Sequence, residues 1–133
     1  MGVGNLPAVV RKITDLLVKA VLTHSHPDHA GGIGHFEDIY VHGADLPAAA
    51  LLKSENVKNF MQTLFSEDAP DVKEIGKVRF HIVSDRDAFD LGGRTVTVME
   101  TPGHTLGSIV LMGSQTLPFQ RRCLQSKSIA CFA

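Results

Sequence analysis

The sequence contains few features of secreted, membrane or nucleic-acid-binding proteins. Its 133 residues include no tryptophan, one tyrosine and two cysteines, and 13 basic side chains nearly balance 14 acidic ones. A net charge of −1 provides no field that would attract nucleic acid or an anionic membrane. No apolar run approaches a membrane span, and the N-terminus lacks the pattern of a secretory signal. We therefore expect a cytoplasmic protein with no membrane or nucleic-acid partner.

The two cysteines, Cys123 and Cys131, lie in a C-terminal segment that contains no acidic residue. A disulfide between them is compatible with the sequence, but two free thiols fit a reducing compartment better. This segment also lacks the periodicity of a helix or a strand. We therefore divide the chain into one domain over residues 1–113 and an irregular tail over residues 114–133.

Hydrophobic periodicity predicts that helices and strands are mixed along the domain. Helical spacing of apolar residues predicts helices at residues 6–17, 47–52 and 57–65, the first with Asn5 as its N-cap. Alternating or continuous apolar runs predict strands at residues 18–22, 39–41, 78–82, 94–99 and 108–112. The turn Leu91-Gly92-Gly93 favours a hairpin between the segments that flank it. This mixture predicts one layered α/β or α+β domain.

Four metal-binding side chains fall within six consecutive positions, directly after a predicted strand. The motif THSHPDH contains His24, His26, Asp28 and His29. His24 and His26 are two residues apart, so an extended backbone directs both imidazoles to one side, where they can bind one ion at about 2.0–2.1 Å. Asp28 and His29 can begin a second metal position. A polar loop with incidental histidines is the plainer interpretation, but this density of ligands is typical of metal sites.

Two separate motifs resemble those of the metallo-β-lactamase superfamily. THSHPDHAGG resembles the His-x-His-x-Asp-His motif of that family, and ETPGHTLGSIVL resembles its later histidine loop. The segment DRDAFDLGGRTVTVMETPGHT is also similar to the hairpin that leads to that loop. The resemblance extends over residues 2–112. It implies a partial four-layer αββα sandwich, about the N-terminal half of the family fold.

The resemblance also implies a set of site residues. His24, His26 and His104 match the three-histidine first zinc site, and Asp28 and His29 match part of the second. We therefore expect one or two zinc ions as cofactors. Three protein ligands and an open fourth position let zinc activate water and polarise a carbonyl. Asp28 is the candidate catalytic residue, either as a ligand of the second metal or as the group that orients the nucleophile.

The function implied by the resemblance is that of a zinc-dependent hydrolase. Metal-activated water would attack an ester, thioester or lactone-like carbonyl of a small-molecule substrate. The alternative is a catalytically impaired fragment that binds metal through the three-histidine site alone. This alternative stays open because the bridging aspartate and the last histidine of the family pattern have no match in the sequence.

The missing parts of the family pattern include the first strands and their Asp-x-Gly turn. The C-terminal run LPFQRRCLQSKSIACFA also lacks the strand, helix and strand of the family pattern. A truncated gene model or a shifted reading frame would explain this run, and transcript sequencing across the codons for residues 112–120 tests that hypothesis. An incomplete sandwich would leave apolar sheet surface uncovered. We therefore expect a homo-oligomer that buries this surface.

The remaining histidines and two threonines are interpreted without a metal. His35, His42 and His81 are expected to be packing or surface residues. Thr23 and Thr105 flank ligand histidines, and either hold the imidazoles through hydrogen bonds or simply favour strand conformation.

Overall fold

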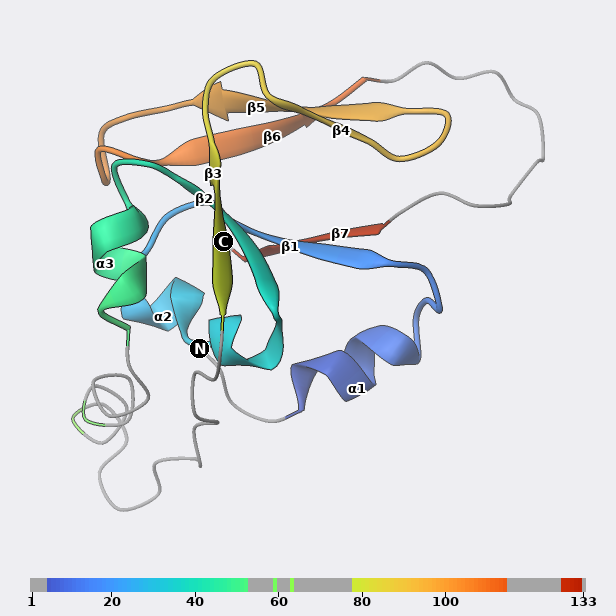
Figure 1. The fold of residues 1–133 in the computed structure, drawn as a ribbon, viewed down its shortest axis with the longest axis horizontal. Helices are drawn as coiled ribbons and strands as arrows, with labels where there is room; N and C mark the ends of the chain where they lie inside the picture. The colour runs from blue at the N-terminus through green and yellow to red at the C-terminus, as the bar shows by residue number, and fades with distance from the viewer. Residues whose placement is uncertain (1–4, 53–58, 60–62, 64–77, 115–127, 133) are drawn as a thin grey trace.

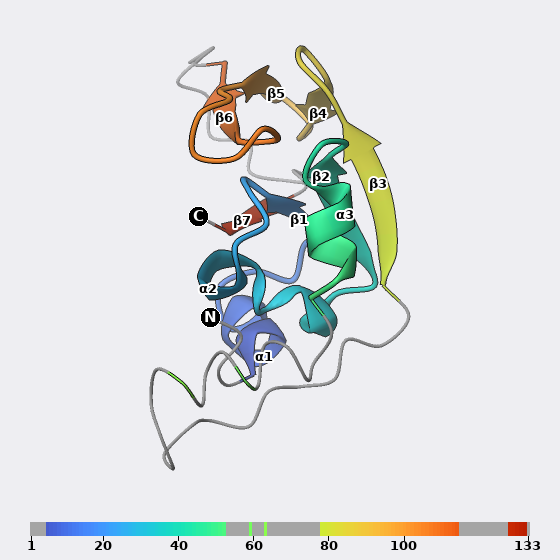
Figure 2. The ribbon, with the colours of Figure 1, turned by 90° about the vertical axis from the view of Figure 1, so that its left-hand side faces the viewer.

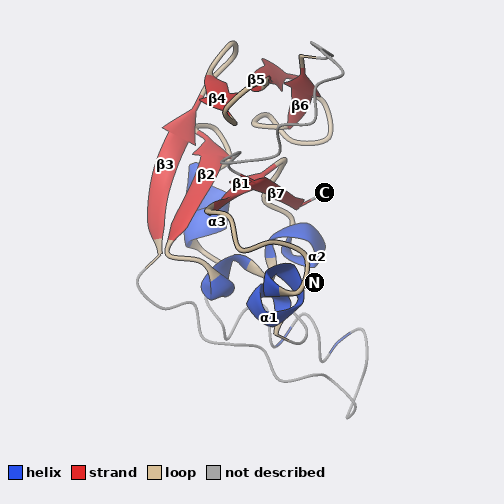
Figure 3. Cartoon of the chain, turned by 90° about the vertical axis from the view of Figure 1, so that its right-hand side faces the viewer, coloured by secondary structure: helices blue, strands red, loops and turns tan. Residues whose placement is uncertain are grey.

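The computed structural model describes residues 5–52, 59, 63, 78–114 and 128–132 of the chain (Figure 1). Its elements form three layers, which are helices, a four-stranded sheet and a three-stranded sheet (Figure 2). The helices lie on the side of the four-stranded sheet that faces away from the other sheet (Figure 3). They are α1 (Leu6–Arg11), α2 (Pro27–Ala30), the 3-10 helix η1 (Ile33–His35) and α3 (Leu46–Ala50). This mixed arrangement of helices and sheets confirms the predicted fold class.

The four-stranded sheet is parallel throughout, in the order β3-β2-β1-β7. Its strands are β1 (Val18–Leu22), β2 (Asp38–His42), β3 (Arg79–Val83) and β7 (Ser128–Phe132). The first three confirm predicted strands. β7 lies in the range expected to be an irregular tail, and that expectation is wrong for these five residues because pairing with β1 supplies backbone hydrogen bonds that no local pattern indicates.

The three-stranded sheet is antiparallel, in the order β4-β5-β6. Its strands are β4 (Ala88–Asp90), β5 (Thr95–Glu100) and β6 (Ile109–Gly113). β4 and β5 form a hairpin at the predicted turn, which contains Gly92 and Gly93 at φ values of 74° and 120°, a backbone region that favours glycine. The expected partner strand is wrong, because the strand predicted at residues 78–82 is β3, which pairs with β2 in the other sheet. The strand predicted at residues 108–112 is confirmed as β6, but most of its residues are not buried. Val110 and Met112 are exposed because no described helix covers the outer face of this sheet.

β1 lies between two hydrophobic cores. Its alternating side chains point to opposite faces, so that Ala20 and Leu22 pack towards the helices while Val21 packs between the sheets. All three side chains are fully buried. The core between the sheets also contains Val83, Phe89, Leu91, Val98 and Ile109. Packing on both faces fixes the carboxyl end of β1, from which the histidine motif continues.

Helix α1 is shorter than predicted. Asn5 is its N-cap, as expected, but the helix ends at Arg11 although helical spacing of apolar residues continues to residue 17. The side chain of Thr14 accepts a hydrogen bond from the amide of Leu16 at 3.1 Å. Such local bonds compete with helix propagation. Ile13, beyond the helix, is consequently 80% exposed.

Other sequence predictions have mixed outcomes. The helix predicted at residues 47–52 is confirmed as α3. The helix predicted at residues 57–65 lies outside the described residues, apart from 59 and 63, and so does Cys123. In the part of the chain that is described, we find no helix long and apolar enough to cross a bilayer.

Candidate metal centre

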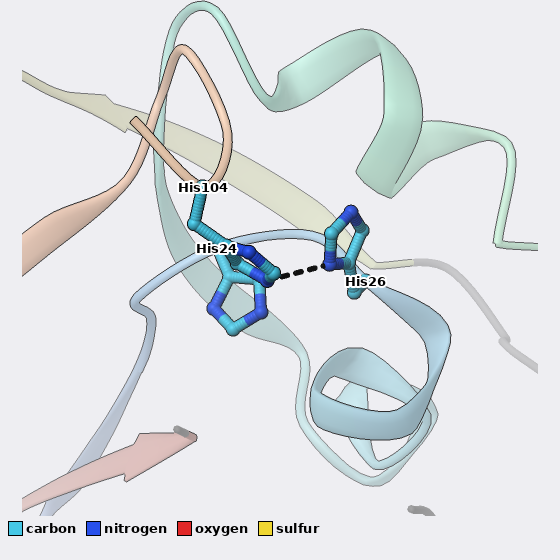
Figure 4. A group of neighbouring side chains, drawn as sticks. All are labelled: His24, His26 and His104. Carbon is cyan, nitrogen blue, oxygen red and sulfur yellow. Dashed lines mark hydrogen bonds between the residues drawn. The ribbon is translucent and has the colours of Figure 1, made fainter. Parts of the chain in front are cut away.

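Three imidazoles converge at the carboxyl edge of the parallel sheet (Figure 4). His24 and His26 follow β1, and His104 lies on the loop between β5 and β6. One ring nitrogen from each histidine lies within 4.8 Å of the other two. The Nδ1 atom of His26 and the Nε2 atom of His104 are 2.9 Å apart. The structure therefore brings together the three residues that the sequence analysis assigned to a first metal site.

The three histidines fit a zinc ion in geometry and in chemistry. Ligand nitrogens of a tetrahedral zinc site lie roughly 3.3 Å apart when each bond is about 2.0–2.1 Å. The Nε2 atom of His24 is buried, with no hydrogen-bond partner among the described residues. Burial lowers the pKa of His24, and the nearby imidazoles of His29, His104 and His26 lower it further. This favours the neutral imidazole, the form that binds metal.

The local backbone directs these side chains. His26 has an extended conformation (φ −66°, ψ 142°) and is the N-cap residue of α2. Ser25, between the two histidines, is buried and its hydroxyl donates a hydrogen bond to Asp45. The hydroxyl of Thr23 lies 3.4 Å from the Nδ1 atom of His24. Of the two alternatives for Thr23, this contact favours a role in holding the imidazole.

Asp28 and His29 lie beside the three-histidine group without being part of it. Both belong to α2, and Oδ2 of Asp28 is 3.3 Å from Nε2 of His29. The ring of His29 is 4.3 Å from the ring of His24, centroid to centroid. The other ring nitrogen of His29 is buried, without a hydrogen-bond partner in the described part of the chain. Through His24, the two residues therefore adjoin the three-histidine group.

Comparison with known families decides what the chain is related to. The family model described as "Metallo-beta-lactamase superfamily" matches residues 17–112, which contain both histidine motifs. The chain belongs to this superfamily.

Individual members of the superfamily align over the same region. The acyl-coenzyme A thioesterase MBLAC2 of Gallus gallus is 37% identical over 101 residues, which cover 69% of this chain and 36% of that protein. The protein of the same name from Homo sapiens is 36% identical. A hydroxyacylglutathione hydrolase of Yersinia pestis is 32% identical, over 73% of this chain and 30% of its own length. The chain thus spans about a third of the length of these relatives.

A solved structure from the superfamily shares the fold. MEM-A1, a subclass B3 metallo-beta-lactamase from a soil metagenome library, aligns with a TM-score of 0.50 and 26% identity. The alignment covers 82% of this chain and 42% of the lactamase. The layered arrangement of helices and sheets is therefore part of the metallo-beta-lactamase fold.

A buried carboxylate that the sequence analysis did not assign to the site connects its two loops. Asp45, 4% exposed, stands at the N-cap position of α3, yet its side chain makes no capping hydrogen bond. Oδ2 accepts hydrogen bonds from the amide and hydroxyl of Ser25 and from the hydroxyl of Thr105, and Oδ1 accepts one from the amide of Gly107. The position of Asp45 just after β2, at the same sheet edge as the histidine motif, is the signal that could have identified it.

The remaining histidines lie outside the group in this superfamily member. His42 bonds through Nε2 to Oε1 of Glu100 at 3.0 Å, while its Nδ1 accepts the amide of Ala44. His81 bonds to Asp38 on the exposed part of the sheet. His35 lies in η1. The interpretation of these three as packing or surface residues agrees with their positions.

Proposed function

We propose that this chain forms the metal-binding part of a zinc-dependent hydrolase that acts on an ester, thioester or lactone-like carbonyl of a small molecule. The observation that carries the proposal is the convergence of His24, His26 and His104. Three neutral nitrogen ligands that leave a fourth position open are typical of catalytic rather than structural zinc. Membership of the metallo-beta-lactamase superfamily supports the same conclusion.

Each residue has a defined part in this proposal. His24, His26 and His104 would hold the ion. When bound, zinc supplies a Lewis acid that polarises a carbonyl oxygen and makes water nucleophilic at neutral pH. Asp28, in the first turn of α2, would orient the nucleophile or contribute to a second metal position with His29.

Thioesters are the substrates to test first. The aligned relatives include proteins named acyl-coenzyme A thioesterase and hydroxyacylglutathione hydrolase, and both names denote the hydrolysis of acyl compounds. Because the chain spans about a third of these relatives, the acyl group and the thiol carrier are left open in the proposal.

The alternative is a metal-binding fragment without turnover. It is supported by the composition of the ligand group, which among the described residues comprises three histidines and includes neither Asp28 nor His29. Such a protein would bind one ion at the first site and fail to assemble a two-metal centre.

Elemental analysis combined with a thioesterase and lactonase screen tests both candidates. We expect zinc in the wild-type chain, hydrolysis of a thioester, and loss of both in His26→Ala. His81→Ala is the matched control, because it removes an imidazole outside the group. About one zinc per chain without hydrolysis would favour the fragment. Absence of zinc from both wild type and His81→Ala would overturn the metal site.

We further propose that the chain self-associates through the outer face of the β4-β5-β6 sheet. Met99, Val110 and Met112 are exposed on β5 and β6, and apolar surface of this kind commonly marks an interface. Sedimentation velocity would detect the association. A wild-type chain that sediments as a monomer at all concentrations would contradict it.

A further inference from the structure

We propose that Asp45 is the positioning residue of the metal centre. Its carboxylate ties the loop that carries His24 and His26 to the loop that carries His104, so that the three imidazoles are held in place before a metal binds. This inference rests on the proposed function, because it assigns Asp45 a role towards the metal that the three histidines would hold.

The hydrogen bonds of Asp45 reach both loops at positions next to the ligands. Ser25 stands between His24 and His26, and it donates its amide at 2.9 Å and its hydroxyl at 3.0 Å. Thr105 follows His104 directly and donates its hydroxyl at 3.0 Å. Gly107 donates its amide at 2.9 Å. One side chain thus anchors two segments that are about 80 residues apart in the sequence.

Ser25, Thr105 and Gly107 donate all four of these hydrogen bonds to Asp45, and the site therefore requires the ionised carboxylate. Burial alone would raise the pKa of Asp45, but the hydrogen bonds from Thr105, Ser25 and Gly107 outweigh this effect and the pKa is lowered. An asparagine has nearly the same shape but carries two N–H donors on one arm. In either orientation its amide nitrogen would face a donor of the His104 loop, Thr105 or Gly107, so Asp45→Asn would weaken the anchor without creating a cavity.

Thr105 and Ser108 extend the anchor into the His104 loop. The hydroxyl of Thr105 is used towards Asp45, so the hydroxyl of Ser108, 2.8 Å away, is left to donate to Thr105. Ser108 also accepts the amide of Thr105 at 3.0 Å. This chain of hydrogen bonds fixes the backbone on the carboxyl side of His104. It also explains Thr105, which bonds to Asp45 and not to an imidazole.

A backbone hydrogen bond also connects the two loops at their bases. The amide of Ile109 donates to the carbonyl of Thr23 at 2.9 Å, which fixes the start of β6 against the end of β1. His104 itself is exposed on its loop. Ligands are held to useful precision only when the groups behind them are fixed. Asp45 supplies that support from a third segment, just after β2.

Metal titration of wild type, Asp45→Asn, Thr105→Val and Thr105→Ser tests the inference, with Zn²⁺ for affinity and Co²⁺ for the ligand-field spectrum at saturation. We expect Asp45→Asn to bind both metals about ten- to hundredfold more weakly and to change the Co²⁺ spectrum. Thr105→Val should lower the metal affinity and change the Co²⁺ spectrum in the same direction as Asp45→Asn, but to a smaller extent. Thr105→Ser keeps the hydroxyl and should match wild type. Val98→Ala weakens the inter-sheet core but removes no hydrogen bond of either loop, and should leave the spectrum unchanged.

The outcomes separate the inference from the proposed function. Wild type that binds neither metal would overturn the metal site, and the role of Asp45 with it. Wild type that binds metal, with folded Asp45→Asn of equal affinity and identical spectrum, would overturn the inference alone. If Asp45→Asn does not fold, the threonine pair decides, since equal affinity and spectra for Thr105→Val and Thr105→Ser would also overturn it.

Discussion

The Asp38 carboxylate, at the start of β2, accepts hydrogen bonds from two residues of β3. Arg79 donates through Nε at 2.9 Å and Nη2 at 2.8 Å, and His81 lies 2.7 Å away through Nε2. The bonds from Arg79, followed by the bond from His81, lower the pKa of Asp38 from 3.8 to about 2. A carboxyl group with a lowered pKa stabilises the fold above its unfolded pKa, and this stabilisation is lost as the pH falls through the folded value.

We therefore expect Asp38→Asn to remove part of the pH dependence of stability. The free energy of unfolding of wild type should fall as the pH drops from 3.8 to about 2, and that fall should be smaller in Asp38→Asn. Urea denaturation at a series of pH values measures it. Asp15→Asn changes an exposed carboxylate outside the sheets and should keep the wild-type slope. Equal slopes for the Asp38 variant and wild type would contradict the assignment.

Gly107 is required by the close approach of Asp45. A Cβ atom at residue 107 would lie 2.6 Å from Oδ1 of Asp45, closer than side-chain atoms pack. Gly107→Ala must displace the buried carboxylate, and we expect it to cost about 1–3 kcal/mol. Gly103→Ala is the matched control on the same loop, since a Cβ atom there would meet nothing within 4 Å. Equal urea midpoints for the two variants would show that the loop accommodates the methyl group.

At the residue scale, local spacing predicts the histidine cluster but not its support. His24 and His26 could be grouped because two residues of extended chain direct both side chains to one side. His104 could be added only through family resemblance. Asp45 could not be recognised, because a helix-capping role is the usual interpretation of an aspartate two residues before a proline. Its actual partners lie 20 to 62 residues away in the sequence.

At the scale of elements, the inward face of β5 contributes to the inter-sheet core, whereas the outward face of β6 does not. Val98 in β5 is 0% exposed, whereas Val110 in β6 is 42% exposed. At concentrations where the chain is monomeric, we expect Val98→Ala to destabilise the fold by roughly 2 kcal/mol and Val110→Ala by a few tenths at most. Chemical denaturation of the two variants measures how the same truncation changes the free energy of unfolding at a buried and at an exposed position. A larger loss for Val110→Ala than for Val98→Ala in the monomer would contradict the assignment of the two faces.

Element boundaries were predictable where periodicity was uninterrupted. The predicted range of β1 agrees with the structure, because a mostly apolar run, VKAVL, ends directly before a polar motif. The end of α1 was missed because the spacing of apolar residues does not reveal the side-chain bond at Thr14. β4 was missed because three residues with one buried member, Phe89, carry no period. Short elements of this kind form through their partners.

At the scale of the whole molecule, the family resemblance predicted the layers of helices and sheets. The hydrophobic periodicity of the sequence does not predict them. Periodicity does not reveal that β3 joins the parallel sheet while β4, a few residues later, begins the other sheet. That division is decided by tertiary packing of Val83 and Phe89 in one shared core. It also determines the site, since each sheet contributes histidine loops to the same edge.

Metal should therefore stabilise the molecule as a whole. His24 and His26 extend from the parallel sheet and His104 from the antiparallel one, so an ion held by all three binds the folded chain and links its two sheets. A ligand that binds only the folded state at about 100 times its Kd adds about 2.7 kcal/mol of stability. We expect zinc to raise the Tm of wild type, EDTA to reverse the shift, and His26→Ala to abolish it, as measured by calorimetry. His81→Ala should respond as wild type does, because His81 contacts Asp38 away from the three histidines. A Tm that is the same with zinc and with EDTA would mean that the three imidazoles do not act as a shared site, whatever their distances.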